Sequence, residues 1–484
     1  MLSLRAVVLS FLIYSTWCEE LSFPPDFMFG AASAAYQVEG GWKAADKGES
    51  LWDALTHETP SKVFDGNTGD IACDSYNQWR RDIEMAAELG LSHYRFSLSW
   101  TRILPTGFAN YISEDGKNYY NNLIDGLLAR NIEPLVTIHH FDLPSIFQDM
   151  GGFTNPLIVD WFADFARVVY SLFADRVKYW ISINEPLGLC DAGYNGVIAP
   201  ALHSPDLAVY LCSKYVLLAH AKAWRIYDEE YKPKYHGKMT ISQLALWFEP
   251  LREEDEERTA LMNAFCEERF GHPIFKGNWP PDLAMLIEER SFEKGFSRSR
   301  LPSFTQQEAE YIKGTYDYYA LNHYTTFLVK IAEGNESGIW PFTGAPEIGV
   351  VFRQGEGWET AAPSWFGIYP EGLRNQLNWI REKYGDVQIL ITENGYADDS
   401  NGLRDVERVQ YIKNYLGEVL KAIKIDKINV TAYTAWTLMD NFEWLMGYKI
   451  KYGIYEVDFN SPNRTRTPRD SANYYASVIK NRSL

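Results

Sequence analysis

The sequence predicts a single (β/α)8 barrel, because strand-like and helix-like segments alternate along nearly the whole chain. Eight apolar runs of strand length recur, and amphipathic segments separate most of them. No Gly/Ser-rich or Pro-rich linker divides the 484 residues. An open, doubly wound sheet is the main alternative, but no G-x-G-x-x-G or Walker sequence follows any early strand.

The elements are assigned from the spacing of their apolar residues. Runs rich in β-branched and aromatic residues predict strands at 27–37, 93–100, 133–142, 178–185, 238–248, 316–324, 388–392 and 428–438. Apolar positions three or four residues apart predict helices at 74–89, 116–130, 156–173, 207–231, 366–383 and 406–423. The long insert 334–364 is expected to form a loop over one end of the barrel.

The first 18 residues have the features of a secretory signal peptide. Arg5 precedes an apolar run at 6–14, and residues 15–18 include small side chains suited to cleavage. The apolar run is about half of the ~20 residues that a membrane span needs. We therefore expect a signal peptide at 1–18, a barrel domain at 19–484, and a secreted or lumenal protein without a membrane anchor.

The composition limits the partners of the protein. Acidic residues exceed basic ones by 18 (64 against 46), so a nucleic-acid backbone would be repelled. Of the four N-x-S/T sequons, Asn335, Asn463 and Asn481 are candidates for glycosylation, whereas Asn429 lies in a strand-like run. Four cysteines follow the signal peptide, and the sequence leaves their pairing open: Cys73, Cys190, Cys212 and Cys266.

Polar residues interrupt the apolar strands near their C-terminal ends, which is where (β/α)8 barrels carry their chemistry. Each residue alone has a structural explanation, such as a helix cap or a buried ion pair. Together they are expected to converge on one barrel mouth. They are Arg95, His140, Asn184, Glu185, Asn322, Tyr324, Glu393, Trp436 and Trp444.

Two of these residues suit the cleavage of a glycosidic bond, which needs one carboxylic acid and one carboxylate. Glu185 follows the fourth strand and Glu393 the seventh, so the pair would face each other across the ring. Their pKa values must differ, and Arg95 and Tyr324 are suitable partners for an ionised Glu393.

Metal and serine-hydrolase chemistry have less support. The sequence has nine His and no H-E-x-x-H, C-x-x-C or G-x-S-x-G motif. His139 and His140 are adjacent on a strand, so their side chains point to opposite faces. We expect no metal site and no cofactor.

The motifs of the chain resemble those of glycoside hydrolase family 1, the retaining β-glycosidases with a (β/α)8 barrel. They occur in the family's order throughout the chain after the signal peptide, and secreted animal members, particularly those of insects, are the nearest likeness. The motifs are FGAASAAYQVE at 29–39, YRFSLSW at 94–100, INEP at 183–186, ITENG at 391–395 and DNFEW at 440–444.

The resemblance implies a role for each residue of the expected site. Glu185 would be the general acid/base and Glu393 the nucleophile. Arg95 and Tyr324 would orient Glu393, while Asn322 would support both carboxylates. The others would bind the substrate: Gln37, His140, Asn184, Glu443 and Trp444 its hydroxyl groups, Trp436 the face of the sugar ring and Trp365 the leaving group.

The resemblance favours a β-glucosidase that acts on a small glucoside or oligosaccharide, and leaves two alternatives. The first is a thioglucosidase acting on glucosinolates, for which Arg353 is a candidate contact to the sulfated leaving group. The second is a non-catalytic binding protein, but such relatives typically lack one catalytic glutamate. Phe141 stands where the family commonly has Trp, which alters one sugar contact but not the chemistry. The sequence leaves open the leaving group, the preference for glucose over galactose or fucose, and the oligomeric state, a homodimer included.

Overall fold

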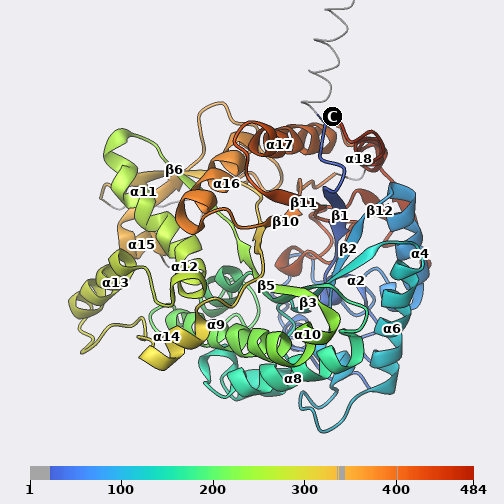
Figure 1. Ribbon diagram of the computed structural model, residues 1–484, viewed down its shortest axis with the longest axis horizontal. Helices are drawn as coiled ribbons and strands as arrows, with labels where there is room; N and C mark the ends of the chain where they lie inside the picture. The colour runs from blue at the N-terminus through green and yellow to red at the C-terminus, as the bar shows by residue number, and fades with distance from the viewer. Residues whose placement is uncertain (1–21, 335, 337–343, 401) are drawn as a thin grey trace, which may run out of the picture.

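The computed structural model describes residues 22–334, 336, 344–400 and 402–484, so the predicted signal peptide lies outside it. Within this part, eight parallel strands close into a barrel in the order β1-β11-β10-β7-β5-β4-β3-β2, with helices around them (Figure 1). The predicted (β/α)8 barrel is confirmed. The strands are β1 (Met28–Ala32), β2 (His93–Ser97), β3 (Glu133–His139), β4 (Tyr179–Asn184), β5 (Lys238–Leu244), β7 (Tyr319–Asn322), β10 (Ile389–Asn394) and β11 (Val430–Ala435).

The helices form the outer layer and the loops between strands. In the described residues they are α2 (Ala35–Val38), α3 (Leu51–Thr56), α4 (Ser75–Leu89), α5 (Trp100–Ile103), α6 (Glu114–Leu128), α7 (Ser145–Asp149), α8 (Ile158–Phe173), α9 (Ala208–Ile226), α10 (Lys232–Tyr235), α11 (Glu256–Asn263), α12 (Arg269–Lys276), α13 (Pro281–Glu293), α14 (Gln306–Ile312), α15 (Gly344–Ile348), α16 (Pro370–Tyr384), α17 (Val406–Lys424) and α18 (Asp470–Asn481).

All eight predicted strands and all six predicted helices are present, but several boundaries differ. The first strand ends at Ala32, so Gln37 lies on the short helix α2. The fifth predicted strand is divided into β5 and a second strand, β6 (Trp247–Pro250). The helices α11–α14 and the last helix α18 were not predicted, and the first four lie in the insertion beside the barrel (Figure 1).

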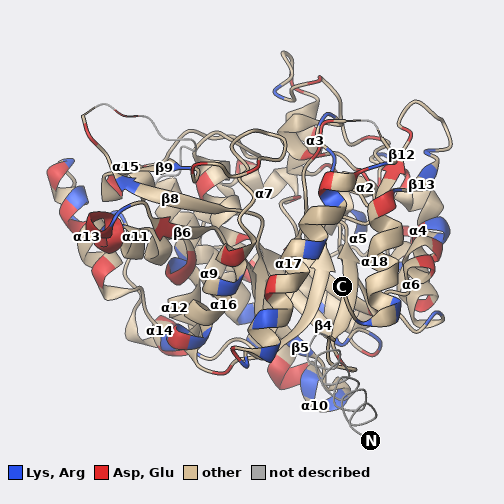
Figure 2. Cartoon of the chain, turned by 90° about the horizontal axis from the view of Figure 1, so that it is seen from above, with Lys and Arg blue, Asp and Glu red and all other residues tan. Residues whose placement is uncertain are grey.

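The expectation that 334–364 is only a loop is wrong. Its described part contains α15 and a strand, β9 (Val350–Arg353), which pairs antiparallel with β8 (Thr326–Ile331). The strand forms because residues 350–352 are consecutive apolar residues and all are buried. With β6, these strands make a small three-stranded sheet. A second small sheet is the antiparallel pair of β12 (Tyr455–Val457) and β13 (Arg466–Pro468). Both sheets lie towards the end of the molecule opposite α10 (Figure 2).

The interior of the barrel is layered because side chains two residues apart on a strand point to the same side. Leu135, Ala320 and Leu390 belong to one small buried apolar cluster. Two residues further along β3 and β10 stand the polar residues Thr137 and Thr392. A polar layer therefore covers an apolar one towards the C-terminal ends of the strands.

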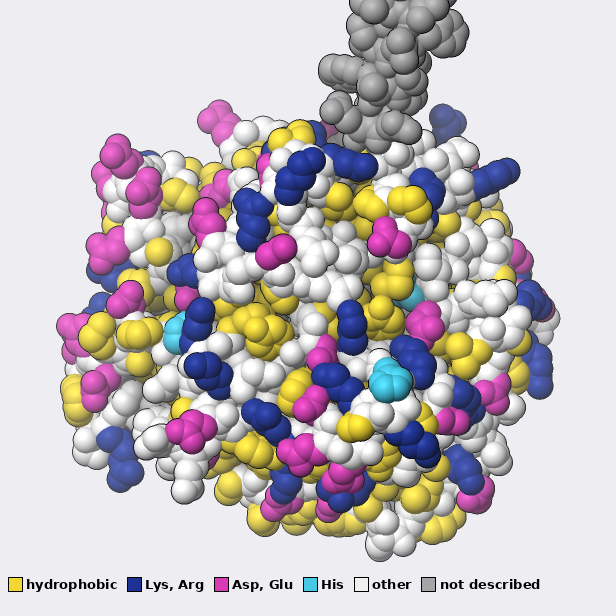
Figure 3. Space-filling model, in the orientation of Figure 1, with side chains coloured by type: hydrophobic (Ala, Val, Ile, Leu, Met, Phe, Trp, Pro, Cys, Tyr) yellow, Lys and Arg dark blue, Asp and Glu magenta, His cyan; other side chains and the backbone are white. Residues whose placement is uncertain are grey.

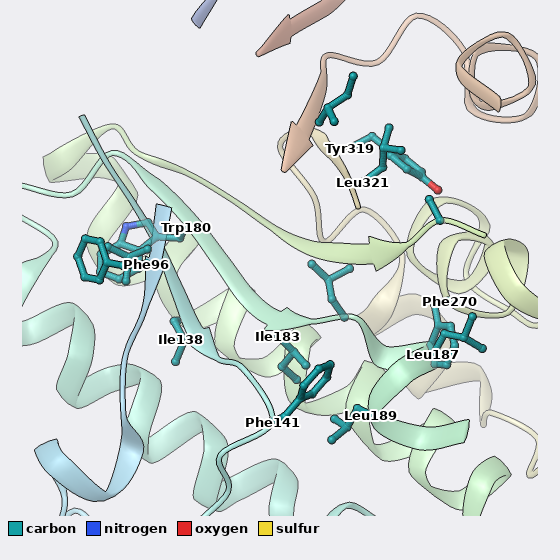
Figure 4. Close-up of a cluster of buried hydrophobic side chains, with 14 of the residues drawn as sticks. Phe96, Ile138, Phe141, Trp180, Ile183, Leu187, Leu189, Phe270, Tyr319 and Leu321 are labelled. Carbon is teal, nitrogen blue, oxygen red and sulfur yellow. The ribbon is translucent and has the colours of Figure 1, made fainter. Parts of the chain in front are cut away.

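The main hydrophobic core lies between the strands and the helices. Figure 4 shows part of it, in which Ile138 on β3 and Ile183 on the neighbouring strand β4 are labelled. On the face shown in Figure 3, basic and acidic side chains are interspersed, so the net charge of −18 is not gathered into one acidic patch there. None of the helices in the described residues is long and apolar enough to span a bilayer.

One disulfide joins Cys190 to Cys212, with Cα atoms 5.5 Å apart. Cys190 lies in the helical turn that follows Glu185, and Cys212 lies on α9. Cys73 and Cys266 are buried free thiols. The disulfide thus fixes the segment after β4 to the outer helix layer.

We expect Cys212→Ala to lower the free energy of unfolding by about 3 kcal/mol, because the bond closes a loop with a sequence separation of 22 residues. Denaturant unfolding measures the change. Cys266→Ala is the matched control, since it removes a buried thiol without breaking a disulfide. A reductant should destabilise the wild type but not Cys212→Ala; equal losses in both variants and no effect of the reductant would contradict the expectation.

Candidate active site

A cavity of about 540 Å³ opens at the C-terminal ends of the barrel strands. The structure brings together the residues predicted to carry out catalysis and to bind the substrate. Gln37, Arg95 and Asn322 are fully buried and bond to residues of the lining. The predicted residues that line the cavity are His140, Asn184, Glu185, Tyr324, Trp365, Glu393, Trp436, Glu443 and Trp444.

The guanidinium of Arg95, on β2, binds groups from four other strands, and its weakest bond runs from Nη1 to Oδ1 of Asn322 on β7 at 3.5 Å. Its Nη1 donates to Oε1 of Glu393 at 2.5 Å and to the carbonyl oxygen of Thr392 at 2.9 Å. Its Nη2 donates to Oδ1 of Asn184 at 2.6 Å, and its Nε to Oγ1 of Thr137 at 3.1 Å. These bonds hold Glu393 in place and supply the positive charge next to it.

Glu393 receives a second strong hydrogen bond, from the hydroxyl of Tyr324 to Oε2 at 2.6 Å. Burial raises the pKa of Glu393, while the charge of Arg95 and the bond from Tyr324 oppose that rise. Both carboxylate oxygens thus accept a bond that favours the ionised form.

Glu185 has a different environment. The amide of Asn322 donates to its Oε1 at 2.8 Å, and no Lys or Arg of the described residues forms an ion pair with it. Burial, and then the charge of Glu393, raise the pKa of Glu185 to about 8. These surroundings of Glu185 favour the protonated acid. The backbone of Glu185 is strained as well, because its φ of +46° is a left-handed conformation that costs a non-glycine residue about 1 kcal/mol.

Two hydroxyl groups set the orientation of the Asn322 amide. Its Oδ1 accepts bonds from the hydroxyls of Thr392 at 2.7 Å and Ser242 at 3.0 Å. Its Nδ2 is therefore turned towards Glu185 and towards Oδ1 of Asn184, which lies at 3.0 Å. Neither hydroxyl was predicted, because a Ser or Thr within a strand carries no functional signal of its own.

A third glutamate, Glu443, lies at the cavity wall. Burial raises the pKa of Glu443 to about 8, with the charges of Glu393 and Glu185 acting in the same direction. Nε2 of Gln37 donates to Oε2 of Glu443 at 3.3 Å and to the carbonyl oxygen of Phe442 at 2.9 Å. This contact joins the loop after β11 to the short helix α2.

Aromatic rings form part of the cavity wall. His140 stacks between Trp436 and Trp444, with ring centroids 5.9 and 6.0 Å away. Phe141 also lines the cavity, and the centroid of its ring lies 5.5 Å from that of Trp444 in an edge-to-face arrangement. His139 instead packs against Trp100, so the two adjacent histidines do point to opposite sides.

The remaining predicted residues that the structure describes are not part of the cavity lining. Arg353 donates to Oε1 of Glu336 at 3.4 Å and does not line the cavity. Asn463 and Asn481 are exposed, and Asn335 lies outside the described residues. Asn429 is also exposed, because β11 begins one residue later, so its predicted position inside a strand is wrong. In the described part of the chain, no three His, Cys, Asp or Glu residues form a group that could hold a metal ion.

A (β/α)8 barrel whose mouth holds two glutamates in unequal environments, one bonded to an amide and one to a guanidinium, has the architecture of a barrel glycoside hydrolase. The comparisons give the particular family. The chain belongs to glycosyl hydrolase family 1, whose model matches residues 19–484. It is therefore a retaining glycosidase and an O-glycoside hydrolase, and the non-catalytic alternative is not retained.

The chain is similar to family members from distant organisms. It is 44% identical to Myrosinase 1 of Brevicoryne brassicae, over 95% of this chain and 99% of that protein. It is 39% identical to the human cytosolic beta-glucosidase, over 96% and 99%. Among solved structures, an aphid myrosinase has a TM-score of 0.90 at 44% identity, over 95% and 99%, and a rice beta-glucosidase 0.88 at 34%, over the same shares.

We expect Glu443→Gln to stabilise the protein at alkaline pH. An unfolded glutamate ionises near pH 4.3, whereas the folded pKa of Glu443 is about 8. The wild type therefore loses stability as the pH rises between these values, and the whole loss is present above the folded pKa. The variant has no such loss, so its gain should be absent at pH 4 and reach at most about 5 kcal/mol at pH 9, the value for the full difference between the two pKa values.

Chemical unfolding at both pH values tests this. Glu382→Gln, at an exposed position on α16, is the matched control and should show little gain at either pH. A gain for Glu443→Gln that is equal at pH 4 and pH 9 would contradict the expected ionisation.

Proposed function

We propose that the protein is a β-glucosidase that hydrolyses terminal β-D-glucosides by double displacement, with Glu393 as nucleophile and Glu185 as general acid/base. The observation that supports these roles is the unequal environment of the two glutamates. Glu393 accepts bonds from Arg95 and Tyr324, whereas Glu185 has a neutral amide as its partner and a pKa raised to about 8. A nucleophile must be ionised and a general acid protonated, and the contacts favour this assignment.

In the first step, Oε2 or Oε1 of Glu393 forms a bond to the anomeric carbon, and the bond from that carbon to the leaving-group oxygen breaks. Glu185 gives its proton to this oxygen, so the leaving group departs as a neutral alcohol. Arg95 and Tyr324 keep Glu393 fixed and ionised until the bond forms. The product of the step is a glucosyl ester of Glu393.

In the second step, Glu185 is ionised and removes a proton from water, which attacks the anomeric carbon and releases Glu393. Two inversions give a sugar with its β-configuration retained. Ester formation removes the negative charge of Glu393, the second largest cause of the raised pKa of Glu185. The pKa of Glu185 therefore falls when it has to act as a base.

The sugar is held by the side of the cavity opposite to the leaving group. We assign its hydroxyls to His140, Asn184, Glu443 and Gln37, and its apolar face to Trp436. Gln37 suits this role because its Oε1 is buried and has no hydrogen-bond partner among the described residues. Glu443 would accept bonds from the hydroxyls furthest from the anomeric carbon. The ring of Trp444 stacks on that of His140 and limits its rotation.

We also propose that the protein works in a secreted or lumenal compartment. The signal-like residues 1–18 support this, and the disulfide between Cys190 and Cys212 is of a kind that persists in oxidising compartments. The substrate there would be a small-molecule β-glucoside or an oligosaccharide.

A thioglucosidase is the second candidate, favoured by the 44% identity to Myrosinase 1 of Brevicoryne brassicae. The chain has Glu185 to act as an acid in either reaction. Arg353, however, is bonded to Glu336 and lies outside the cavity lining, so it gives no support for a sulfate contact.

We expect Glu185→Gln to lower kcat/KM for an alkyl β-glucoside about 100-fold or more, because an alkoxide leaves poorly without a proton. Dinitrophenyl β-glucoside should be affected far less in the first step, since its leaving group needs little protonation. In the wild type, kcat/KM should decline as the pH rises through the pKa of Glu185, and the variant should lack this decline. Steady-state kinetics over pH 5–10 measure both, and equal losses on the two substrates would argue against an acid role.

We expect Glu393→Gln to lower kcat for both substrates by about 10⁴-fold or more, because no ester can form. The matched control is Glu382→Gln on the surface, which should keep wild-type rates. Proton NMR of the first sugar released by the wild type should show the β-anomer. Release of the α-anomer, or substantial activity of Glu393→Gln, would overturn the mechanism.

A further inference from the structure

The cavity has two unlike sides. Apart from Asn184 at the end of β4, the proposed sugar-binding residues follow β1, β3 and β11, whereas the end of β5 and the segments after β4, β5 and β7 bring apolar side chains to the same space. β4, β5 and β7 are adjacent in the barrel, so these side chains form one continuous wall. We call it the apolar arc, and it consists of Val197, Ile198, Leu244, Leu246 and Phe327.

Other apolar residues complete this half of the cavity. Trp365, before α16, and Leu445 and Met446, after β11, line the same space as the apolar arc. Val197, Ile198 and Leu244 are only partly buried, although most apolar residues at strand ends here are covered completely. This accessible apolar surface is available to a leaving group attached to a sugar at Glu393.

Within the described residues, the lining of the cavity offers no cationic partner to an anion. Its charged lining residues are Glu185, Glu393 and Glu443, and no Lys or Arg of the described residues lines it. An anionic leaving group would therefore lose its hydration without gaining a cationic partner, which is unfavourable in a poorly solvated site.

Few polar groups are available to a second sugar. Beyond the sugar-binding side, the lining has the hydroxyls of Thr325 and Tyr452. Thr325 already donates to the carbonyl oxygen of Gly367 at 2.7 Å. A hydroxyl-rich leaving group would lose its bonds to water and regain few of them.

We propose that the natural leaving group is a large, uncharged and mainly apolar group, and that Leu244 and Ile198 are specificity-determining residues for it. This inference rests on the proposed function, because it takes Glu185 and Glu393 as the place where the bond is cut. The polar half of the cavity selects the sugar, and the apolar arc selects what is attached to it.

The first test compares β-glucosides that differ only in the leaving group. For methyl, hexyl and octyl β-glucoside, assayed below micelle-forming concentrations, kcat/KM should rise about threefold per added methylene until the apolar arc is covered. Octyl β-glucoside should exceed both cellobiose and a sulfated thioglucoside (a glucosinolate) by at least tenfold in kcat/KM.

The second test changes the apolar arc. Leu244→Asn should lower the octyl-to-methyl ratio of kcat/KM about tenfold, because it replaces apolar contact with an amide of similar size. Ile198→Asn should lower the same ratio, and it provides an independent test if Leu244→Asn does not fold. The matched controls are Leu403→Asn and Ile425→Asn, at exposed positions outside the cavity lining, which should keep the wild-type ratio.

The outcomes separate this inference from the function on which it rests. Three results would overturn the inference alone. The first is a kcat/KM that does not depend on the length of the alkyl chain, and the second is an unchanged octyl-to-methyl ratio of kcat/KM in both Leu244→Asn and Ile198→Asn. The third is faster cleavage of cellobiose or of the sulfated thioglucoside than of octyl β-glucoside. Failure to hydrolyse any β-glucoside, including the dinitrophenyl one, would overturn the proposed function as well.

Discussion

The buried guanidinium of Arg95 is the interaction on which the barrel mouth depends. A buried positive charge is tolerated only where several acceptors surround it, and Arg95 finds them on β3, β4 and β10. Its planar fork orients Asn184 and Glu393 at the same time, which a lysine could not do. The catalytic geometry is therefore set by the barrel strands themselves and not by the loops above them.

This arrangement places three glutamates around one cavity. Glu185, Glu393 and Glu443 all have raised pKa values because burial disfavours their ionised forms, and only Glu393 is paired with a cation. Their repulsion destabilises the free protein, but it also keeps a proton on Glu185 where one is needed. Such a cost in stability is common where a site must be reactive.

The sequence was sufficient to predict the barrel and the residues at its mouth. Glu185 and Glu393 stand out because a carboxylate after an apolar strand is conspicuous, and the barrel places both strand ends on one face. The helix α11 was missed because its buried face includes Thr259 and Asn263 with a single Met, so it lacks an apolar period.

Other features could not be predicted because they depend on tertiary contacts. Ile198 and Leu244 look like core residues in the sequence, and only the folded chain shows that they face a cavity. The pairing of Cys190 with Cys212 likewise follows from the turn after Glu185, whose backbone conformation no residue type signals.

The pairing of β1 with β11 has a consequence for the synthesis of the protein. β1 is among the first segments to leave the ribosome, yet its partner follows roughly 400 residues later. At 5–20 residues per second, β1 must wait roughly 20–80 s with one edge unpaired. The exposed edge of a strand invites pairing with other chains. A ring that leaves no free edge in the finished enzyme is thus most vulnerable to aggregation while it is being made.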